Sequence, residues 1–331
     1  MPDLAQRCSR HDRVAALLAA CSDGQLATPS TTVGVGGGSS VLDVDGVPVF
    51  VKRIPITGRE LASPHGTANL FGLPAHWQYG MYRLPGPGFN TWRELAANQI
   101  VTDGVLAGET AAFPLLHHWR ILPGRPPAAA EHHDLEPVIA QFGGHPAVRA
   151  RFEALAGASA SLVLFLEHLP ELLPEWLADP IGRAEAVERQ LFEITAFLRD
   201  RELLHLDGHF GNIRADSDRL YLVDFGLATS PRFDLSPAER DFAAHNLGHD
   251  ADYAAMRLVN WLVSTACGIP FPARDQFVRR CATGDLDPDV PQHLSRIITR
   301  HAPAAARMNT FCTRLHDGDL DAGYPGSPLT R

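Results

Sequence analysis

The amino-acid sequence predicts an α+β protein, with strands mainly in the first half of the chain and helices mainly in the second. Between residues 32 and 52, β-branched residues alternate with polar ones on both sides of Asp45-Gly46, which is typical of two antiparallel strands joined by a tight turn. The apolar run 161–167 has the length and composition of a buried strand. Beyond residue 180, apolar residues recur at helical spacing over long stretches, so we expect helices to dominate there.

The same patterns predict the order of the elements. A short helix comes first, followed by three strands, one of them after a glycine run, and then by a helix whose N-cap is Asn90 or Thr91. Two further strands and three long helical segments complete the chain. The predicted ranges are a helix at 10–21, strands within 32–52, a helix at 92–105, strands at 113–122 and 161–167, and helices at 183–200, 253–265 and 291–316.

Composition shifts along the chain predict its organisation. Residues 1–30 read as an N-terminal extension, and residues 31–166 as a β-rich part. Gly- and Pro-rich insertions at about 54–90 and 123–150 interrupt that β-rich part. Residues 167–316 form a mainly helical part, and residues 317–331 form a flexible tail.

Bulk composition excludes several classes of function. The chain has 331 residues with 45% hydrophobic residues and a net charge of −9, so it lacks the basic excess that a nucleic-acid partner would favour. Its five cysteines follow no disulfide or zinc pattern. Residues 1–18 lack the apolar core of a signal peptide, and no apolar run is long enough to span a bilayer. We therefore expect a cytoplasmic protein with no membrane or nucleic-acid partner.

Two acidic motifs follow one another in the second half of the chain. Asp207 lies in the pattern H-x-D-x-x-x-x-N, which begins at His205 and ends at Asn212, and Asp224 opens an Asp-Phe-Gly run after a short hairpin. A phosphoryl-transfer site needs one carboxylate to orient a hydroxyl, and an amide and a second carboxylate to hold Mg²⁺. Each motif alone is compatible with an ordinary turn, but the two in this order predict such a site.

A glycine run and a lysine precede these motifs. Lys52 lies within the apolar strand Val-Phe-Val-Lys, where an unpaired lysine would be costly, so we expect a phosphate and a carboxylate beside it. Glu94, on the helix at 92–105, is the preferred carboxylate, and Glu60 is the alternative. The run approximates G-x-G-x-x-G-x-V and could place backbone N–H groups over phosphates. Its candidate nucleotide-binding residues are Gly34, Gly36, Gly37, Gly38, Ser39 and Val41.

With these motifs, residues 30–265 resemble the protein-kinase-like superfamily, which includes eukaryotic-type Ser/Thr kinases and aminoglycoside phosphotransferases. The resemblance implies a bilobal fold, with ATP and Mg²⁺ bound between a β-rich and a helical lobe. It assigns Lys52 to the α- and β-phosphates and Glu94 to Lys52. It also implies that Glu167-His168-Leu169 is the hinge beside adenine, that Asp207 is the catalytic base, and that Asn212 and Asp224 are the metal ligands.

The acceptor is less well specified by the motifs. The run Asp224-Phe225-Gly226-Leu227-Ala228 resembles protein kinases, which favours Ser or Thr of a protein or peptide slightly. Three features depart from the protein-kinase pattern. Leu206 replaces its arginine, and His209, two residues after Asp207, gives a D-x-H form that is similar to the motif of small-molecule phosphotransferases. The A-P-E motif is matched only approximately, at 236–239. A small-molecule O-phosphotransferase of the aminoglycoside or antibiotic type is therefore the alternative, and a pseudokinase scaffold that binds nucleotide without turnover is a further one.

Overall fold

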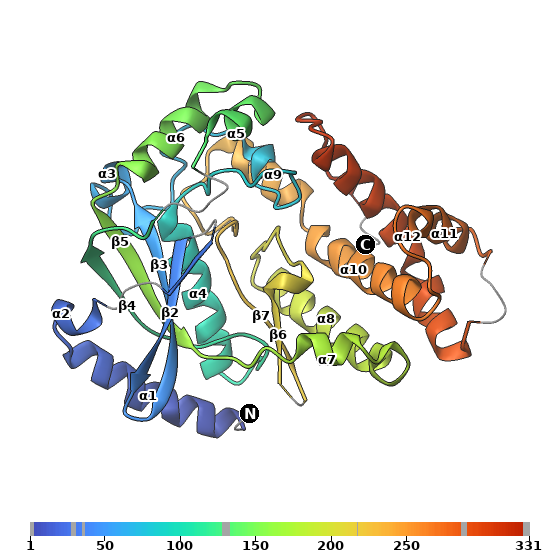
Figure 1. Ribbon diagram of the computed structural model, residues 1–331, viewed down its shortest axis with the longest axis horizontal. Helices are drawn as coiled ribbons and strands as arrows, with labels where there is room; N and C mark the ends of the chain where they lie inside the picture. The colour runs from blue at the N-terminus through green and yellow to red at the C-terminus, as the bar shows by residue number, and fades with distance from the viewer. Residues whose placement is uncertain are drawn as a thin grey trace.

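The structure is a computed structural model that describes residues 3–27, 31–34, 37–127, 133–216, 218–285 and 290–326. The fold is α+β, as predicted. A five-stranded antiparallel sheet forms one side of the molecule and long helices form the other, with a two-stranded hairpin between them (Figure 1).

The sheet has the strand order β1-β2-β3-β5-β4. At the predicted turn between β2 and β3, Asp45 and Gly46 adopt positive φ angles of 52° and 74°, which a tight hairpin turn requires. The predicted strand at 113–122 begins three residues later than expected. The bounds are β1 Thr32–Gly34, β2 Gly37–Val44, β3 Val47–Ile56, β4 Leu116–Pro123 and β5 Ala160–Glu167.

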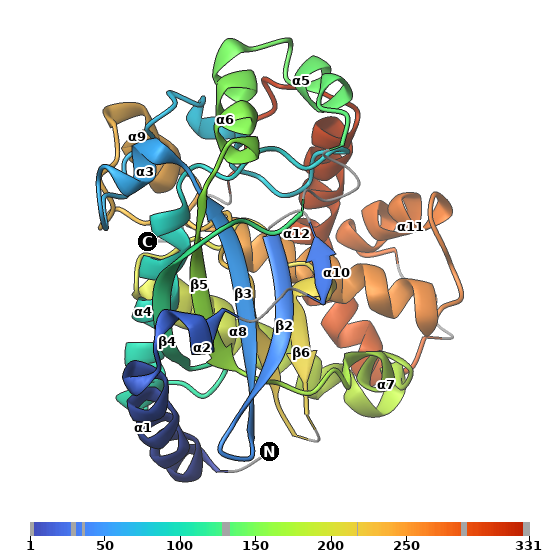
Figure 2. The ribbon, with the colours of Figure 1, turned by 60° about the vertical axis from the view of Figure 1, so that its left-hand side comes forward.

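Helices cover both faces of this sheet (Figure 2). On one face, α1 (Leu4–Ala20) buries Val14 and Leu18, and α2 (Asp23–Leu26) buries Leu26, in a cluster with Val49, Val51 and Phe165. On the other face, α4 (Thr91–Leu106) packs against the strands and is capped by Asn90, whose side chain accepts from the backbone of Trp92. The N-terminal residues predicted as an extension are therefore part of the core of the sheet.

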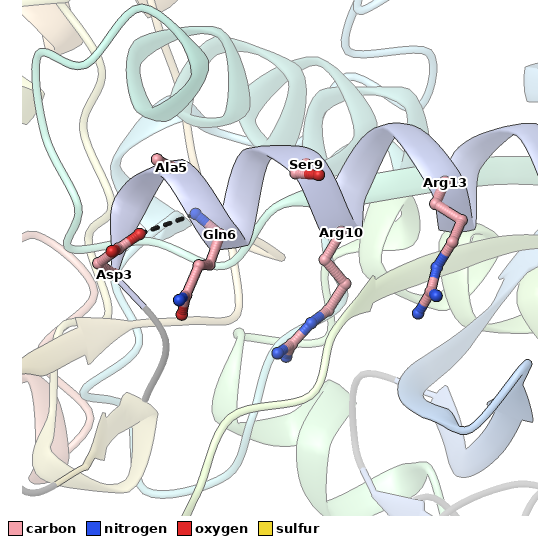
Figure 3. Close-up of a pocket in the computed structure, with 6 residues that line it drawn as sticks. All are labelled: Asp3, Ala5, Gln6, Ser9, Arg10 and Arg13. Carbon is pink, nitrogen blue, oxygen red and sulfur yellow. Dashed lines mark hydrogen bonds between the residues drawn. The ribbon is translucent and has the colours of Figure 1, made fainter.

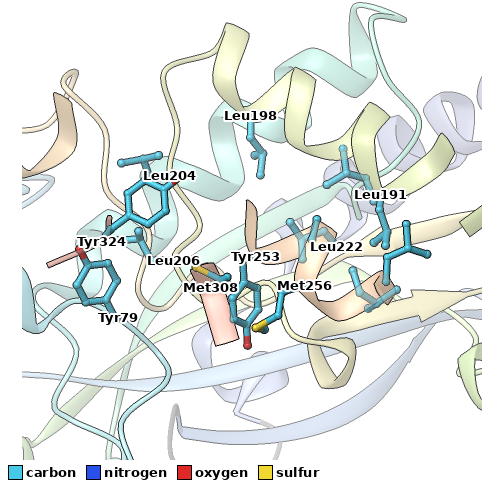
Figure 4. Packing of buried hydrophobic residues seen from close by; sticks show 14 of the residues in the cluster. Tyr79, Leu191, Leu198, Leu204, Leu206, Leu222, Tyr253, Met256, Met308 and Tyr324 are labelled. Carbon is cyan, nitrogen blue, oxygen red and sulfur yellow. The ribbon is translucent and has the colours of Figure 1, made fainter. Parts of the chain in front are cut away.

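The largest apolar cluster of the described residues lies mainly in the helical part and also includes residues of α4 and of both insertions. The helical spacing of apolar residues predicted after residue 180 is confirmed in α8 (Pro180–Asp200), where Val187, Leu191, Ile194 and Leu198 are buried. Figure 4 shows Leu191 and Leu198 in the cluster that also contains Leu222 and Met256. Helices α9 and α11 were not predicted as separate elements. The elements are α7 Leu173–Leu177, α8 Pro180–Asp200, β6 Ile213–Ala215, β7 Leu220–Leu222, α9 Pro237–His245, α10 His249–Thr265, α11 Ala273–Ala282 and α12 Gln292–His316.

Both predicted insertions contain helices. β3 continues to Ile56, so the first insertion begins later than residue 54; it carries α3 (Gly58–Leu61) and the 3₁₀ turn η1 (Ala75–Trp77). The second carries α5 (Glu136–Gln141) and α6 (Pro146–Ala156). Val148 and Phe152 on α6 are buried, so this segment contributes to the core and not only to the surface.

The chain beyond α12 differs from the predicted flexible tail. Ala322 and Tyr324 are buried. The Tyr324 hydroxyl donates to Asp252 Oδ2 at 2.9 Å, and the Tyr324 carbonyl lies 2.7 Å from His245 Nε2. The tail prediction is wrong as far as Tyr324, because one aromatic anchor offsets the Gly- and Pro-rich composition around it. No helix in the described part of the chain combines the length and apolar character needed to cross a bilayer.

Candidate active site

Lys52 lies at the centre of the candidate site. It projects from β3, and its Nζ lies 2.6 Å from Glu94 Oε1 and 2.8 Å from Asp224 Oδ1. Its side chain is only 11% exposed. Burial alone would lower the pKa of Lys52, but the two carboxylates more than offset it and raise that pKa above its ordinary value. Lys52 is therefore a permanent buried cation held between acids from two other segments.

The structure distinguishes the two glutamates considered as partners of Lys52. Glu94 lies in the first turn of α4 and makes the contact. Glu60 instead pairs with Arg151 at 2.9 Å and accepts hydrogen bonds from the backbone N–H groups of Thr57 and Thr91. The predicted pairing with Glu94 is confirmed, and Glu60 has a structural role at the junction of β3, α3 and α4.

Asp224 follows β7 and turns its carboxylate toward Lys52. Its φ of 67° is unusual for a residue with a side chain, and the backbone N–H of Gly226 donates to its Oδ1 at 3.2 Å. Burial opposes ionisation of Asp224, but Lys52 outweighs burial and lowers the pKa of Asp224 to about 2. The carboxylate is thus ionised at neutral pH and remains 42% exposed, so an additional cation could reach it.

The loop that carries Asp207 is held by an acid from α10. Asp250 accepts hydrogen bonds from the backbone N–H groups of His205 at 2.6 Å and Leu206 at 3.0 Å. Leu206 has a φ of 62°, a conformation that this anchoring stabilises. Asp250 was not predicted as a site residue. Its only signal in the sequence is that it follows Gly248-His249 at the start of an apolar helical pattern.

Asp207 and Asn212 converge, as their motif predicts. Asn212 Nδ2 donates to the Asp207 carbonyl at 2.9 Å and lies 3.3 Å from Asp207 Oδ2. Because Nδ2 is used in this way, Asn212 Oδ1 is the atom left to bind a cation. Burial and the negative charge of Asp224 raise the pKa of Asp207 to about 8. Asp207 is therefore a carboxyl group with enhanced basicity.

The first insertion lies directly against this loop. The N–H of Gly80 donates to the Leu206 carbonyl at 3.2 Å, and a Cβ at position 80 would fall 2.0 Å from Asp207 Oδ1. Tyr79 is buried, stacks on His249 and bonds to Asn246 through its hydroxyl. The insertion, whose role the sequence left open, thus forms one wall of the site, and only glycine fits at position 80.

Much of the glycine run lies in strands and not in the predicted loop. Gly36 lies outside the described residues, and Gly34 ends β1. Gly37 has a φ of 131°, and a Cβ there would fall 2.2 Å from the Arg53 carbonyl, so its lack of a side chain serves the close approach of β3. The remaining candidates, Gly38, Ser39 and Val41, lie within β2 opposite Arg53, Lys52 and Phe50.

β2 nevertheless leaves an open apolar surface beside Lys52. Ser39 pairs with Lys52 and Val41 pairs with Phe50, so these four side chains share one face of the sheet. Val41 is 52% exposed and Phe50 is partly buried. A flat aromatic group could cover this surface.

The predicted hinge has two features that the sequence did not reveal. The Glu167 carboxylate is buried against Arg7 of α1, with 2.7 Å between Oε2 and Nη2, and the Glu167 N–H donates to the Leu115 carbonyl. Its carboxylate therefore binds the N-terminal helix, and its N–H is already used. Leu169 is buried, and its predicted role beside adenine stays a prediction.

Neither a hollow along α1 nor any cluster of metal-binding side chains in the described part of the chain adds residues to this site. The hollow is lined by one helix only, and its acid, Asp3, serves as the N-cap of that helix by accepting from the backbone of Gln6 (Figure 3). Among the described residues, no three histidine, cysteine, aspartate or glutamate side chains cluster in a way that could hold a metal. A cation at Asp224 and Asn212 would therefore need ligands from a substrate.

No protein-family model matches the chain, and no curated protein sequence matches it.

Proposed function

We propose that this protein is an ATP- and Mg²⁺-dependent phosphotransferase with a bilobal, protein-kinase-like fold. The main support is the convergence on Lys52 of two carboxylates that lie 42 and 172 residues away in the chain. A buried lysine between two acids provides a fixed positive charge where phosphate groups could bind. In this proposal, the five-stranded sheet with α1 and α4 is the smaller lobe and helices α7 to α12 belong to the larger one.

The donor set fits a magnesium ion bound together with a nucleotide. Mg²⁺ usually takes one or two protein oxygen ligands and completes its shell with water and phosphate oxygens. Asp224 would offer an ionised, partly exposed carboxylate, and Asn212 would offer Oδ1. Mg²⁺ bound there would supply charge neutralisation for the phosphates.

Asp207 is the group that would handle the proton. It would accept the proton of the acceptor hydroxyl as that oxygen takes the phosphoryl group and ADP leaves. The raised pKa of Asp207 supports this assignment, because a carboxylate with a pKa of about 8 accepts a proton more readily than an ordinary aspartate does. Lys52 would hold the phosphates in line, and the open apolar face beside Val41 would receive the adenine ring.

The favoured acceptor is a Ser or Thr hydroxyl of a protein or peptide, on the basis of the Asp-Phe-Gly-Leu-Ala run. A hydroxylated small molecule is the alternative. The short connection between Gly226 and α9 at Pro237, together with the insertion that covers Asp207, gives that alternative support. Both acceptors use the same site residues.

The test is Mg²⁺-dependent release of ADP, together with autophosphorylation, measured for the wild type, Asp207→Ala and Asp224→Asn. We expect the wild type to turn over ATP, Asp207→Ala to lose about 10²- to 10⁴-fold in rate while still binding ATP, and Asp224→Asn to lose its response to Mg²⁺. Circular dichroism of each variant checks that the fold is intact. ATP binding without turnover by the wild type would instead favour a nucleotide-binding scaffold, and full activity of Asp224→Asn would remove the metal assignment.

A further inference from the structure

Gly80 of the first insertion limits the directions from which an acceptor can approach the Asp207 carboxylate. Gly80 covers Oδ1, and that buried oxygen has no hydrogen-bond partner among the described residues. The side chain as a whole is still 21% exposed. An acceptor must therefore reach Asp207 from the side that the insertion leaves open.

Residues of the same loop and of α10 lie beside Asp207. His209 Nε2 is 3.7 Å from Asp207 Oδ1, and the next residue is Phe210. The guanidinium carbon of Arg257 on α10 lies 5.0 Å from the centre of the Phe210 ring. One turn earlier on α10, the ring of Tyr253 comes within 4.0 Å of the Cβ position of Gly208. This face of α10 therefore runs along the loop that carries the catalytic base.

Arg257 differs from the fully buried arginines of the protein. Each of those has a carboxylate within 2.9 Å: Arg7 has Glu167, Arg93 has Glu239, and Arg151 has Glu60. Arg257 is partly buried, its Nε is buried without a hydrogen bond, and no ion pair joins it to any described residue. A guanidinium that loses water without gaining an anion is costly, so an anion from outside the chain would stabilise it.

The neighbouring histidine does not supply a second cation. Burial and the charge of Arg257 lower the pKa of His209 below its ordinary value, so that His209 is neutral at neutral pH. Arg257 is then a fixed positive charge beside the loop that carries Asp207.

We propose that the acceptor carries a carboxylate or phosphate close to the hydroxyl that is phosphorylated, and that Arg257 binds this anionic group. The inference rests on the proposed phosphotransferase function and specifies its acceptor. The acceptor oxygen forms the new bond to the γ-phosphorus, the bond to the ADP oxygen breaks, and the proton passes to Asp207. Polycationic acceptors such as aminoglycosides are disfavoured, because they would face an arginine with the same charge.

The experiment compares two pairs of acceptors of opposite charge with the full-length protein, ATP and Mg²⁺. One pair is a serine peptide flanked by Asp and Glu and the same peptide flanked by Lys and Arg. The other pair is glucose 6-phosphate and glucosamine. Each is assayed with the wild type, Arg257→Gln and the matched control Arg183→Gln. Arg183 is also partly buried and lies over an aromatic ring, that of Trp176 at 4.5 Å, but on α8.

We expect the wild type to use at least one acidic acceptor with kcat/KM at least tenfold above that of its basic counterpart. Arg257→Gln should raise KM for that acceptor about tenfold, leave KM for ATP within twofold and abolish the preference for acidic acceptors, while Arg183→Gln should match the wild type. The pair that responds shows whether the anionic group belongs to a peptide or to a small metabolite.

Several outcomes would overturn the inference. They are equal or better use of the basic acceptors, identical kinetics of Arg257→Gln and the wild type, or transfer to neither acidic probe. In each of these cases, Mg²⁺-dependent ADP release or autophosphorylation that is lost in Asp207→Ala would leave the phosphotransferase proposal standing. Absence of that turnover would remove both proposals.

Discussion

Individual residues of the site are held in conformations that the rest of the protein must maintain. Lys52 keeps its charge inside the molecule because Glu94 and Asp224 approach it from α4 and from the end of β7. Asp224 and Leu206 adopt positive φ angles, and such strain is usually found where a function depends on the geometry. Each of these side chains can be tested alone.

The first prediction concerns the Lys52 pair. Lys52→Ala should lower kcat/KM for ATP by about 10²-fold or more, because it removes the fixed charge that would face the phosphates under the proposed function. Glu94→Gln should lower it less, since Lys52 keeps Asp224 as a partner. Steady-state kinetics with varied ATP measures both effects. Glu193→Gln on α8, whose side chain is 51% exposed, is the control. Unchanged ATP kinetics of Lys52→Ala, or a larger loss in Glu193→Gln than in Glu94→Gln, would contradict this assignment.

The second prediction concerns Gly80. Gly80→Ala should displace Asp207, because the new Cβ would lie 2.0 Å from Oδ1, and a shift of about 1 Å can reduce kcat by about 10²-fold. The affinity for ATP, measured by calorimetry, should stay within twofold of the wild type. Gly58→Ala in α3 serves as the control, since nothing lies within 4 Å of its Cβ position. An unchanged kcat for Gly80→Ala would show that the insertion can move away from Asp207.

At the scale of elements, Glu60 joins α3, α4 and α6 near the end of β3. Its carboxylate accepts from the backbone of Thr57 before α3 and of Thr91 at the start of α4, and it pairs with Arg151 of α6. Its carbonyl accepts from the indole of Trp92 at 2.9 Å. This connection sets where α4 begins, and α4 in turn places Glu94 beside Lys52.

The third prediction follows from this role. Glu60→Gln should lower the free energy of unfolding by about 3 to 5 kcal/mol at pH 7, because it leaves Arg151 buried without its anion. Burial opposes ionisation of Glu60, but Arg151 outweighs burial and lowers its pKa below the ordinary 4.5. The stabilisation is therefore complete above about pH 4.5 and is lost as the pH falls through the lowered pKa. Urea unfolding between pH 7 and pH 3 should show the wild type approaching Glu60→Gln in acid, and a pH-independent difference would contradict the linkage.

At the scale of the whole molecule, the first insertion connects the sheet to the helical part. Thr67 in the insertion bonds to Asp234 at 2.9 Å, and Arg93 on α4 pairs with Glu239 on α9 at 2.6 Å. Together with Tyr79 and Asn246, these contacts join segments that lie 146 to 167 residues apart. They hold the wall formed by Gly80 against the loop of Asp207.

The fourth prediction tests this connection. Glu239→Gln should destabilise the protein by about 3 to 5 kcal/mol, because Arg93 is buried and loses its counter-charge. Glu193→Gln breaks an exposed pair within α8, with side chains 62% and 51% exposed, and should cost about 0.5 kcal/mol or less. Denaturant unfolding of both variants gives the comparison. Similar costs for the two would show that the contact between α4 and α9 contributes little.

Much of this arrangement was accessible from local patterns. The Asp45-Gly46 turn, the apolar face of α8 and the folding back of Asn212 toward Asp207 depend on residues near one another in sequence, so their spacing predicts them. The pairing of Lys52 with Glu94 was also predicted, because a lysine in an apolar strand requires a nearby acid.

Other features were decided only by the tertiary structure. Nothing local indicates that α1 covers the sheet, that Gly80 lies on Asp207, that Asp250 anchors the His205 loop, or that Tyr324 is buried. Each depends on contacts between segments more than 30 residues apart, whose partners a local pattern cannot specify. The sequence by itself indicated that Lys52 lies on a strand and that Asp207, Asn212 and Asp224 lie in loops, because these features depend on neighbouring residues. The packing of distant segments decided that Gly80 closes one side of Asp207 and that Arg257 lies over Phe210 in the same loop.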